Sequence, residues 1–234
     1  IETVNAGKHI LCEKAITVNA AQLEEVLELA KEKGVVVREA MTISHMPLYK
    51  KLKERIKEGA IGNTKMVQVN FGSNKGYDST QRFFALEAAG GALLDIGVYA
   101  TAFARTFLSE MPNTILTTGA DEQSGIIMKN TKGEMVVMCL TLRAKQPKRG
   151  VVTGDKGYIE VYEYPRACKA TIINTATGEV ETVEAGKTED ALKYEVEAME
   201  AAIEGNLEDD CQIITKDTMR ILTSIKTQWG MKYP

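Results

Sequence analysis

The sequence has few of the residues that build metal centres or disulfide frameworks. Its 234 residues include only two histidines and four cysteines, and no two cysteines have a C-x-x-C spacing. No histidine has a cysteine or carboxylate at ligand spacing, so we predict no metal site. Scattered cysteines favour free thiols in a reducing compartment, and the expected location is therefore cytoplasmic.

The net charge is also small, and long apolar runs are scarce. The formal net charge is -3 at pH 7, which offers no basic field for nucleic acid and no polybasic stretch for a membrane surface. We find no signal peptide and no apolar run that we expect to span a bilayer. With 44% hydrophobic and 26% charged residues, the composition is that of a globular protein with a substantial core.

The first part of the chain alternates short apolar runs with helical periodicity. Residues 9–12 and 35–37 are apolar runs typical of buried parallel strands. Asn19, with Gln22 three residues later, predicts a capping box at the start of the helix that follows the first run. A second helix is predicted over 47–58. The order strand, helix, strand, helix predicts a parallel α/β unit.

From Met66 onward the pattern becomes mostly β. Alternating segments flank turns at 130–133, 154–157 and 175–178, which predicts three successive hairpins and an antiparallel sheet. Two helical patterns close the chain, and each has one apolar face. The face of the first helix consists of Leu192, Val196, Met199 and Ile203. The face of the second consists of Met219, Leu222, Ile225 and Trp229. The predicted fold class is α/β followed by α+β, with a boundary between residues 65 and 66.

A glycine pair, Gly90 and Gly91, opens a segment whose apolar residues recur at helical spacing through Phe107. Asp95 and Tyr99 are four residues apart, so they share one face of this predicted helix. A carboxylate and a phenol at that spacing can act on one proton if the face borders a cleft. The alternative is an ordinary core helix on which Tyr99 is half-buried.

Glu13 and Lys14 follow the first predicted strand. Ligands of open α/β sheets bind beyond the carboxyl ends of the parallel strands. A partly shielded lysine there can hold a hydroxyl or carbonyl oxygen while charge develops on it. The alternative is a solvated strand end. In the polar loop over 72–87, Tyr77 and Arg82 are candidates to contact substrate hydroxyls, although both types are also common as surface residues. His45 is equally well explained by capping or packing.

Taken together, these segments resemble a known family. Ala6-Gly-Lys-His-Ile-Leu-Cys-Glu-Lys14 and Gly90-Gly-Ala-Leu-Leu-Asp-Ile-Gly-Val-Tyr99 are similar to the AGKHVxCEKP and GGALLDxGxxxH/Y signatures of the Gfo/Idh/MocA family of NAD(P)-dependent oxidoreductases. The resemblance implies that residues 1–65 are the carboxyl-terminal part of a dinucleotide-binding Rossmann domain. It implies that residues 66–234 form a domain for substrate binding and oligomerisation.

The resemblance also implies roles for individual residues. Lys14 would be the active-site lysine near nicotinamide and substrate, Glu13 would help to bind the cofactor, and Asp95 would be the paired acid. Tyr99 stands where sugar-oxidising members commonly have histidine, as in the branch that resembles dihydrodiol dehydrogenases. The implied reaction is hydride transfer between nicotinamide and a secondary alcohol of a sugar, polyol or cyclic diol. We expect Tyr99 to exchange the hydroxyl proton, with the Lys14 cation favouring the phenolate.

Two departures qualify the implied site. Ala15 replaces the proline that usually follows the lysine, and no G-x-G-x-x-G occurs in the chain. We therefore expect the chain to be the carboxyl-terminal portion of an enzyme, and the choice between NAD and NADP stays open. The alternative is a non-catalytic sensor of a dinucleotide or sugar with the same fold. The family also implies a homodimer or homotetramer joined through the exposed sheet face.

Overall fold

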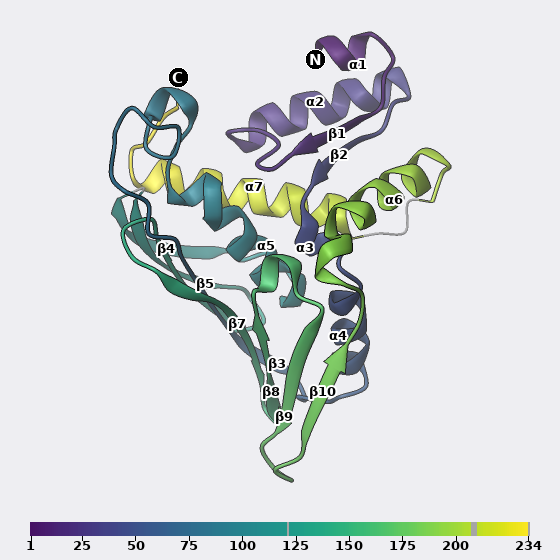
Figure 1. The fold of residues 1–234 in the computed structure, drawn as a ribbon, viewed down its shortest axis with the longest axis vertical. Helices are drawn as coiled ribbons and strands as arrows, with labels where there is room; N and C mark the ends of the chain where they lie inside the picture. The colour runs from purple at the N-terminus through teal and green to yellow at the C-terminus, as the bar shows by residue number, and fades with distance from the viewer. Residues whose placement is uncertain (121, 207–209, 234) are drawn as a thin grey trace.

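The computed structural model describes residues 1–120, 122–206 and 210–233. It consists of a small α/β unit and a large sheet, with a long helix between them (Figure 1). The small unit contains helices α1 (Glu2–Asn5) and α2 (Ala20–Lys33) and strands β1 (Ile10–Glu13) and β2 (Val37–Ala40). Helix α7 (Cys211–Gln228) lies between this unit and the sheet.

Strands β1 and β2 pair in parallel, with Ile10 opposite Val37, which confirms the predicted parallel unit. The strands begin one and two residues later than predicted. Just ahead of them the Val36 amide donates to the His9 side chain, at Nδ1 and 2.9 Å, and not to a main-chain carbonyl. The predicted cap of α2 is confirmed, since the Asn19 side chain accepts from the Gln22 amide at 2.9 Å.

The large sheet has the strand order β10-β9-β8-β7-β3-β6-β5-β4. Strand β3 is in the middle of it, parallel to β6 and antiparallel to β7, while the other neighbours are antiparallel. The predicted fold class and all three predicted hairpins are confirmed. The strands are β3 (Thr64–Gly72), β4 (Thr114–Ala120), β5 (Gln123–Lys129), β6 (Met135–Thr141), β7 (Gln146–Gly154), β8 (Gly157–Tyr162), β9 (Lys169–Asn174) and β10 (Val180–Glu184).

Helices α3 (Thr42–His45) and α4 (Pro47–Lys57) connect the two parts. Helix α4, which the predicted boundary assigns to the first domain, packs beside β10, and Arg55 pairs with Glu181 there at 2.6 Å. Helix α7 contacts both parts: the Thr223 hydroxyl accepts from the Ala20 amide at 3.0 Å, and the helix also packs on β4.

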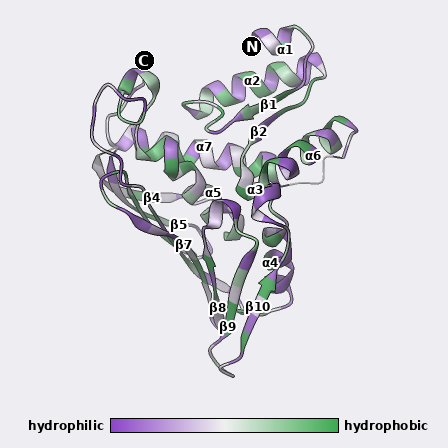
Figure 2. Ribbon diagram, viewed as in Figure 1, coloured by the Kyte–Doolittle hydropathy of each residue, from purple (hydrophilic) through white to green (hydrophobic). Residues whose placement is uncertain are grey.

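Helix α5 (Val98–Phe107) forms the centre of the core together with α7. Figure 2 shows apolar residues recurring along α7 and the strands of the large sheet. Phe103 is fully buried against the sheet, and a Cβ added at Gly150 would lie only 2.2 Å from its ring, so β7 requires glycine there. The apolar segment Leu86–Phe107 is, by length and composition, long enough to cross a membrane, contrary to the sequence-based expectation; 67% of its most apolar window is buried inside this fold.

Helix α6 (Ala191–Ile203) corrects one prediction. Its predicted apolar face is wrong at three of its four residues, because Leu192 is 52% exposed and Val196 and Ile203 are exposed as well, while Met199 is buried as predicted. The buried stripe is instead Ala191, Glu195, Met199 and Ala202. The two alanines let the helix approach α3 and β2 closely, and this contact determines which face is inside. The predicted face of α7 is confirmed, since Met219, Leu222 and Ile225 are fully buried, and Trp229, just beyond the end of the helix, is half-buried against the same core.

Candidate active site

The structure brings Lys14, Asp95 and Tyr99 together. Lys14 Nζ donates to the main-chain carbonyl of Asp95 at 2.6 Å and to its carboxylate Oδ1 at 3.2 Å. The two side chains are 17% and 24% exposed, so the pair is largely shielded from water. The same ammonium lies 5.0 Å from the centroid of the Tyr99 ring. Residues separated by more than eighty positions therefore form one polar cluster at the carboxyl end of β1.

Local backbone geometry presents Asp95 and Tyr99 to this cluster. Residues 93–97 form a π-helical turn that continues directly into α5. Such turns often occur at functional sites, because the extra residue per turn shifts the side chains that follow. Gly97 allows the turn to sit close to β6, since a Cβ there would lie 2.8 Å from Leu140 Cδ1. With the backbone held against the sheet, Asp95 and Tyr99 stay only partly buried.

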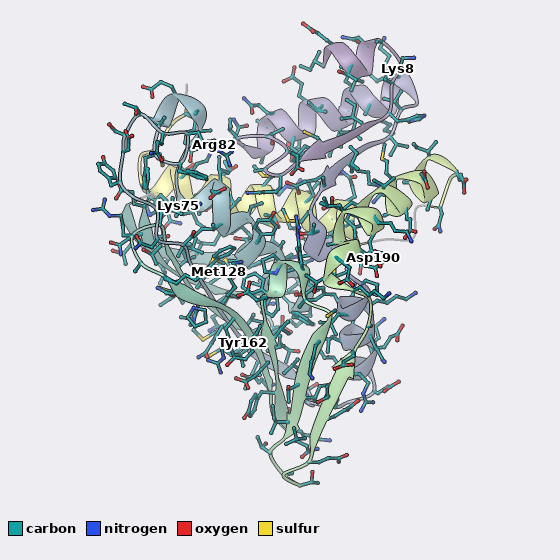
Figure 3. The ribbon with its side chains drawn as sticks, viewed as in Figure 1. Lys8, Lys75, Arg82, Met128, Tyr162 and Asp190 are labelled. Atoms are coloured by element: carbon teal, nitrogen blue, oxygen red, sulfur yellow. The ribbon has the colours of Figure 1, made fainter. Side chains whose placement is uncertain are left out.

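A cavity of about 390 Å³ adjoins the Lys14 and Asp95 pair. One wall comes from the segment after β1 and the other from the loop and turn that lead into α5. Arg82 belongs to the second wall, and Figure 3 shows it on the loop side that faces the small unit. The lining residues are Lys14, Ala15, Thr17, Val18, Arg82, Phe83, Ala88, Ala89, Gly90, Leu94 and Asp95. The peptide bond between Lys14 and Ala15, where the family signature has proline, is cis.

Tyr99 and Glu13 are not among the residues that line this cavity, although Tyr99 lies against the Lys14 ammonium. Tyr77 and His45 also lie outside it. Tyr77 is exposed and packs edge-on against Phe84, with ring centroids 5.1 Å apart, while Arg143 stacks on its other side at 4.8 Å. His45 lines a larger cavity of about 570 Å³ between α4 and the start of α7, which shares no lining residue with the Lys14 cavity. In the described part of the chain, no three histidine, cysteine, aspartate or glutamate side chains come close enough to hold a metal ion.

The surroundings of Tyr99 contradict the expectation of an easily formed phenolate. Burial is the main influence and raises the pKa of Tyr99 to about 12; Arg166 lowers it, while Glu13, Glu195 and Asp95 raise it further. The Lys14 ammonium lies over the ring, where it interacts with the π face, and its charge is already paired with Asp95. Tyr99 is therefore a neutral phenol near pH 7.

Of the buried carboxyl groups in the described residues, two that were not predicted from the sequence, Glu39 and Glu195, interact electrostatically with Lys14 and Tyr99, respectively. Glu39 on β2 is held by the Ile16 amide at 3.0 Å and the Thr215 hydroxyl at 2.9 Å. Glu195 on α6 is 4% exposed, and its Oε1 has no hydrogen-bond partner in the described structure. Burial and then Glu13 raise the pKa of Glu195 to about 7. The only sequence signal for Glu195 was its spacing of four residues from Ala191 and from Met199. Because Glu195 is charged, this row of residues did not look like the buried face of a helix.

Family models match most of the chain. A model described as the GFO/IDH/MocA C-terminal domain matches residues 49–160, and one described as an oxidoreductase family with an NAD-binding Rossmann fold matches residues 1–41. The chain belongs to the Gfo/Idh/MocA family of NAD(P)-binding oxidoreductases, and the predicted resemblance is confirmed. The Lys14, Asp95 and Tyr99 cluster lies where these two matched segments meet in space.

Among its relatives, trans-1,2-dihydrobenzene-1,2-diol dehydrogenase of Xenopus tropicalis is 32% identical over 162 residues, which cover 66% of this chain and 48% of that protein. D-xylose 1-dehydrogenase (NADP(+)) of Hypocrea jecorina is 32% identical over 211 residues, covering 77% and 54%. The chain thus spans about half the length of these curated relatives. The fold matches that of an aldose-aldose oxidoreductase from Caulobacter crescentus with a TM-score of 0.84 at 18% identity, covering 97% of this chain and 72% of that one.

Proposed function

We propose that this chain carries the substrate-side half of an NAD(P)-dependent dehydrogenase that acts on a secondary alcohol of a sugar, polyol or cyclic diol. The observation that supports this most directly is the shared contact of Lys14 with Asp95 and Tyr99 beside a cavity. An ammonium, a carboxylate and a phenol at one place are the groups that an alcohol oxidation needs to hold an oxygen and move its proton. The names of the relatives point to the same substrate class.

Each of the three residues has a distinct task in this proposal. Lys14 donates a hydrogen bond to the reacting oxygen and stabilises the negative charge that develops on it. Asp95 holds the Lys14 ammonium in place through its carboxylate and its main-chain carbonyl. Tyr99 exchanges the hydroxyl proton of the substrate: it accepts that proton while its own phenol proton passes to water. In this proposal Arg82, which lines the far wall of the cavity, contacts another substrate hydroxyl.

The residues at this site fit the nicotinamide end of a dinucleotide. Glu13 and Lys14 lie at the carboxyl end of a parallel strand, where such sheets bind ligands, and the cavity beside them has polar and apolar walls. When bound, the nicotinamide supplies the hydride acceptor. The glycine fingerprint that binds the diphosphate does not occur in these 234 residues. The residue that would distinguish NAD from NADP at the ribose follows that fingerprint, so the proposal includes either cofactor.

The proposal is tested by adding NAD+ or NADP+ and a panel of alcohols to the full-length protein. The panel contains D-xylose, other aldoses, cyclic polyols and a trans-dihydrodiol, and the reduced cofactor is followed by its absorbance. We expect reduction with at least one alcohol, and loss of the signal when that alcohol is omitted. A protein that binds the cofactor but does not reduce it with any alcohol as hydride donor would contradict the proposal and favour the sensor alternative.

We also propose that a second copy of the protein covers the outer face of the large sheet. Leu116, Ile127 and Val137 are all exposed there, and they are direct cross-strand neighbours on β4, β5 and β6. Adjacent exposed apolar residues on a sheet usually mark an interface. The mass of the full-length protein by light scattering should be that of a dimer or tetramer, and Ile127→Lys should reduce it to that of a monomer. A monomeric wild type would exclude this interface.

We further propose a cytoplasmic location, which the free state of all four thiols supports.

A further inference from the structure

Lys226 is a buried cation near the end of α7. It is only 5% exposed, and its Nζ donates to the main-chain carbonyl of Val18 and lies 4.4 Å from the centroid of the Tyr233 ring. Burying an ammonium costs free energy unless other contacts replace the water around it. A carbonyl oxygen and an aromatic face both do so, because each presents negative charge to the cation. Lys226 therefore holds Val18 and Tyr233 at the same point of α7.

The backbone at the end of α7 brings Tyr233 back to Lys226. Gly230 has a φ of 65°, a left-handed conformation that glycine adopts easily, and its amide donates to the Thr227 carbonyl at 3.1 Å. The Met231 amide donates to the Lys226 carbonyl at 2.9 Å. These two bonds form the Schellman motif that ends many helices. The chain therefore turns back after the helix, and the Tyr233 ring reaches the Lys226 ammonium.

The hydroxyl of Tyr233 contacts the opposite wall of the Lys14 cavity. It donates to the main-chain carbonyl of Gly90 at 3.3 Å. Val18 lines the wall that follows β1, and Gly90 lines the wall that leads into α5. Lys226 and Tyr233 thus form a bridge from one wall to the other, although neither is among the described residues that line the cavity.

Helix α7 gives this bridge a fixed base. Its Thr223 hydroxyl accepts from the Ala20 amide at 3.0 Å, so the helix holds the segment after β1 at a second point. Just beyond the helix, Trp229 Nε1 donates to the Thr117 hydroxyl on β4 at 3.1 Å. The bridge is therefore anchored on the large sheet as well as on both walls.

The same two walls carry groups of the proposed reaction. Lys14 belongs to the first wall and Asp95 to the second, and Lys14 Nζ donates to the Asp95 carbonyl at 2.6 Å. Catalysis is sensitive to displacements of such groups by about 1 Å. On the basis of the proposed function, we infer that Lys226 and Tyr233 are positioning residues, which set the separation of the two walls and thereby hold Lys14 and Asp95 at the spacing that the reaction needs.

The test compares Lys226→Met and Tyr233→Phe with Arg220→Met in the full-length protein. Lys226→Met removes the ammonium and keeps an unbranched stem, whereas Tyr233→Phe removes only the hydroxyl that reaches Gly90. Arg220 is the matched control, because it is exposed and joins the same helix to α2 through Glu24 at 2.9 Å, and neither residue lines the cavity.

We expect Lys226→Met to lower kcat for alcohol oxidation by about tenfold or more. Tyr233→Phe loses one hydrogen bond and should lower kcat by about threefold. KM for the alcohol should change by less than about twofold in both variants, since the loss is one of alignment in the transition state. Arg220→Met should keep wild-type kcat. If Lys226 only stabilised the fold, its variant would have a lower thermal midpoint and wild-type kcat well below that midpoint.

Hydrogen exchange followed by mass spectrometry tests the bridge without activity. Lys226→Met should exchange faster than the wild type over residues 14–20 and 83–95, with unchanged exchange over β3 and β6. Tyr233→Phe keeps the ammonium and the ring, and it should exchange faster over 83–95 alone, which covers the case in which Lys226→Met does not fold.

Unchanged exchange at both walls, or wild-type kcat in Lys226→Met, would overturn the inference. Failure of the proposed function gives a different result: the wild type itself would transfer no hydride, while exchange at the two walls would still respond to both variants.

Discussion

Replacing Lys14 with methionine in the full-length protein should lower kcat for alcohol oxidation by about 10³-fold. Methionine keeps an unbranched apolar stem of similar length but removes the ammonium. The Lys14 ammonium is shielded from water and is the donor placed between Asp95 and the cavity, so its loss leaves the developing negative charge on the substrate oxygen unbalanced. The cost falls on the transition state, so kcat should change far more than KM.

Lys8→Met is the matched control for this variant. Lys8 precedes β1 in the same chain segment, but it is exposed and lies at the far end of the small unit from the cavity (Figure 3). We expect wild-type kcat for Lys8→Met. The thermal midpoint of Lys14→Met should fall measurably, because the variant leaves the largely shielded Asp95 carboxylate without its partner, whereas the midpoint of Lys8→Met should not change. A Lys14→Met enzyme that retains a tenth or more of wild-type kcat would exclude an essential role for the ammonium.

Local chemistry explains why much of this fold was predictable. The start of α2 depends on a hydrogen bond between Asn19 and Gln22, which are only three residues apart. The three hairpins depend on short turns that contain glycine. Both signals act between neighbours in the chain, so they can be recognised from the sequence alone. The contact of Lys14 with Asp95 is different, since no local rule links residues so far apart. It was predictable only because both residues belong to segments that resemble the two signatures of one family.

Three features depend on tertiary structure and were missed or reversed. The inner face of α6 is set by close packing on α3 and β2, which selects Ala191 and Ala202 over the larger Leu192. Strand β3 pairs in parallel with β6, although more than sixty residues separate them, and neither strand's pattern indicates its partner. The high pKa of Tyr99 follows from burial, which spacing along a helix does not reveal. Each of these needs the position of atoms that are distant in sequence.

Tyr99→Phe should lower kcat for oxidation by about 10²- to 10³-fold. The change removes one hydroxyl and keeps the ring, which packs against Phe71 with centroids 6.3 Å apart and lies beneath the Lys14 ammonium. Folding and the Lys14 to Asp95 contact should therefore be preserved. Because the phenol is neutral at pH 7, its contribution is the transfer of a proton, and phenylalanine can neither accept that proton nor pass one on.

The size of the loss in Tyr99→Phe separates a chemical role from a packing role. The variant keeps the aromatic ring, so a role in packing alone would leave kcat close to that of the wild type. Tyr162→Phe, which removes an exposed hydroxyl from β8, is the control and should keep wild-type kcat. Near-normal kcat in Tyr99→Phe would show that another group takes the hydroxyl proton.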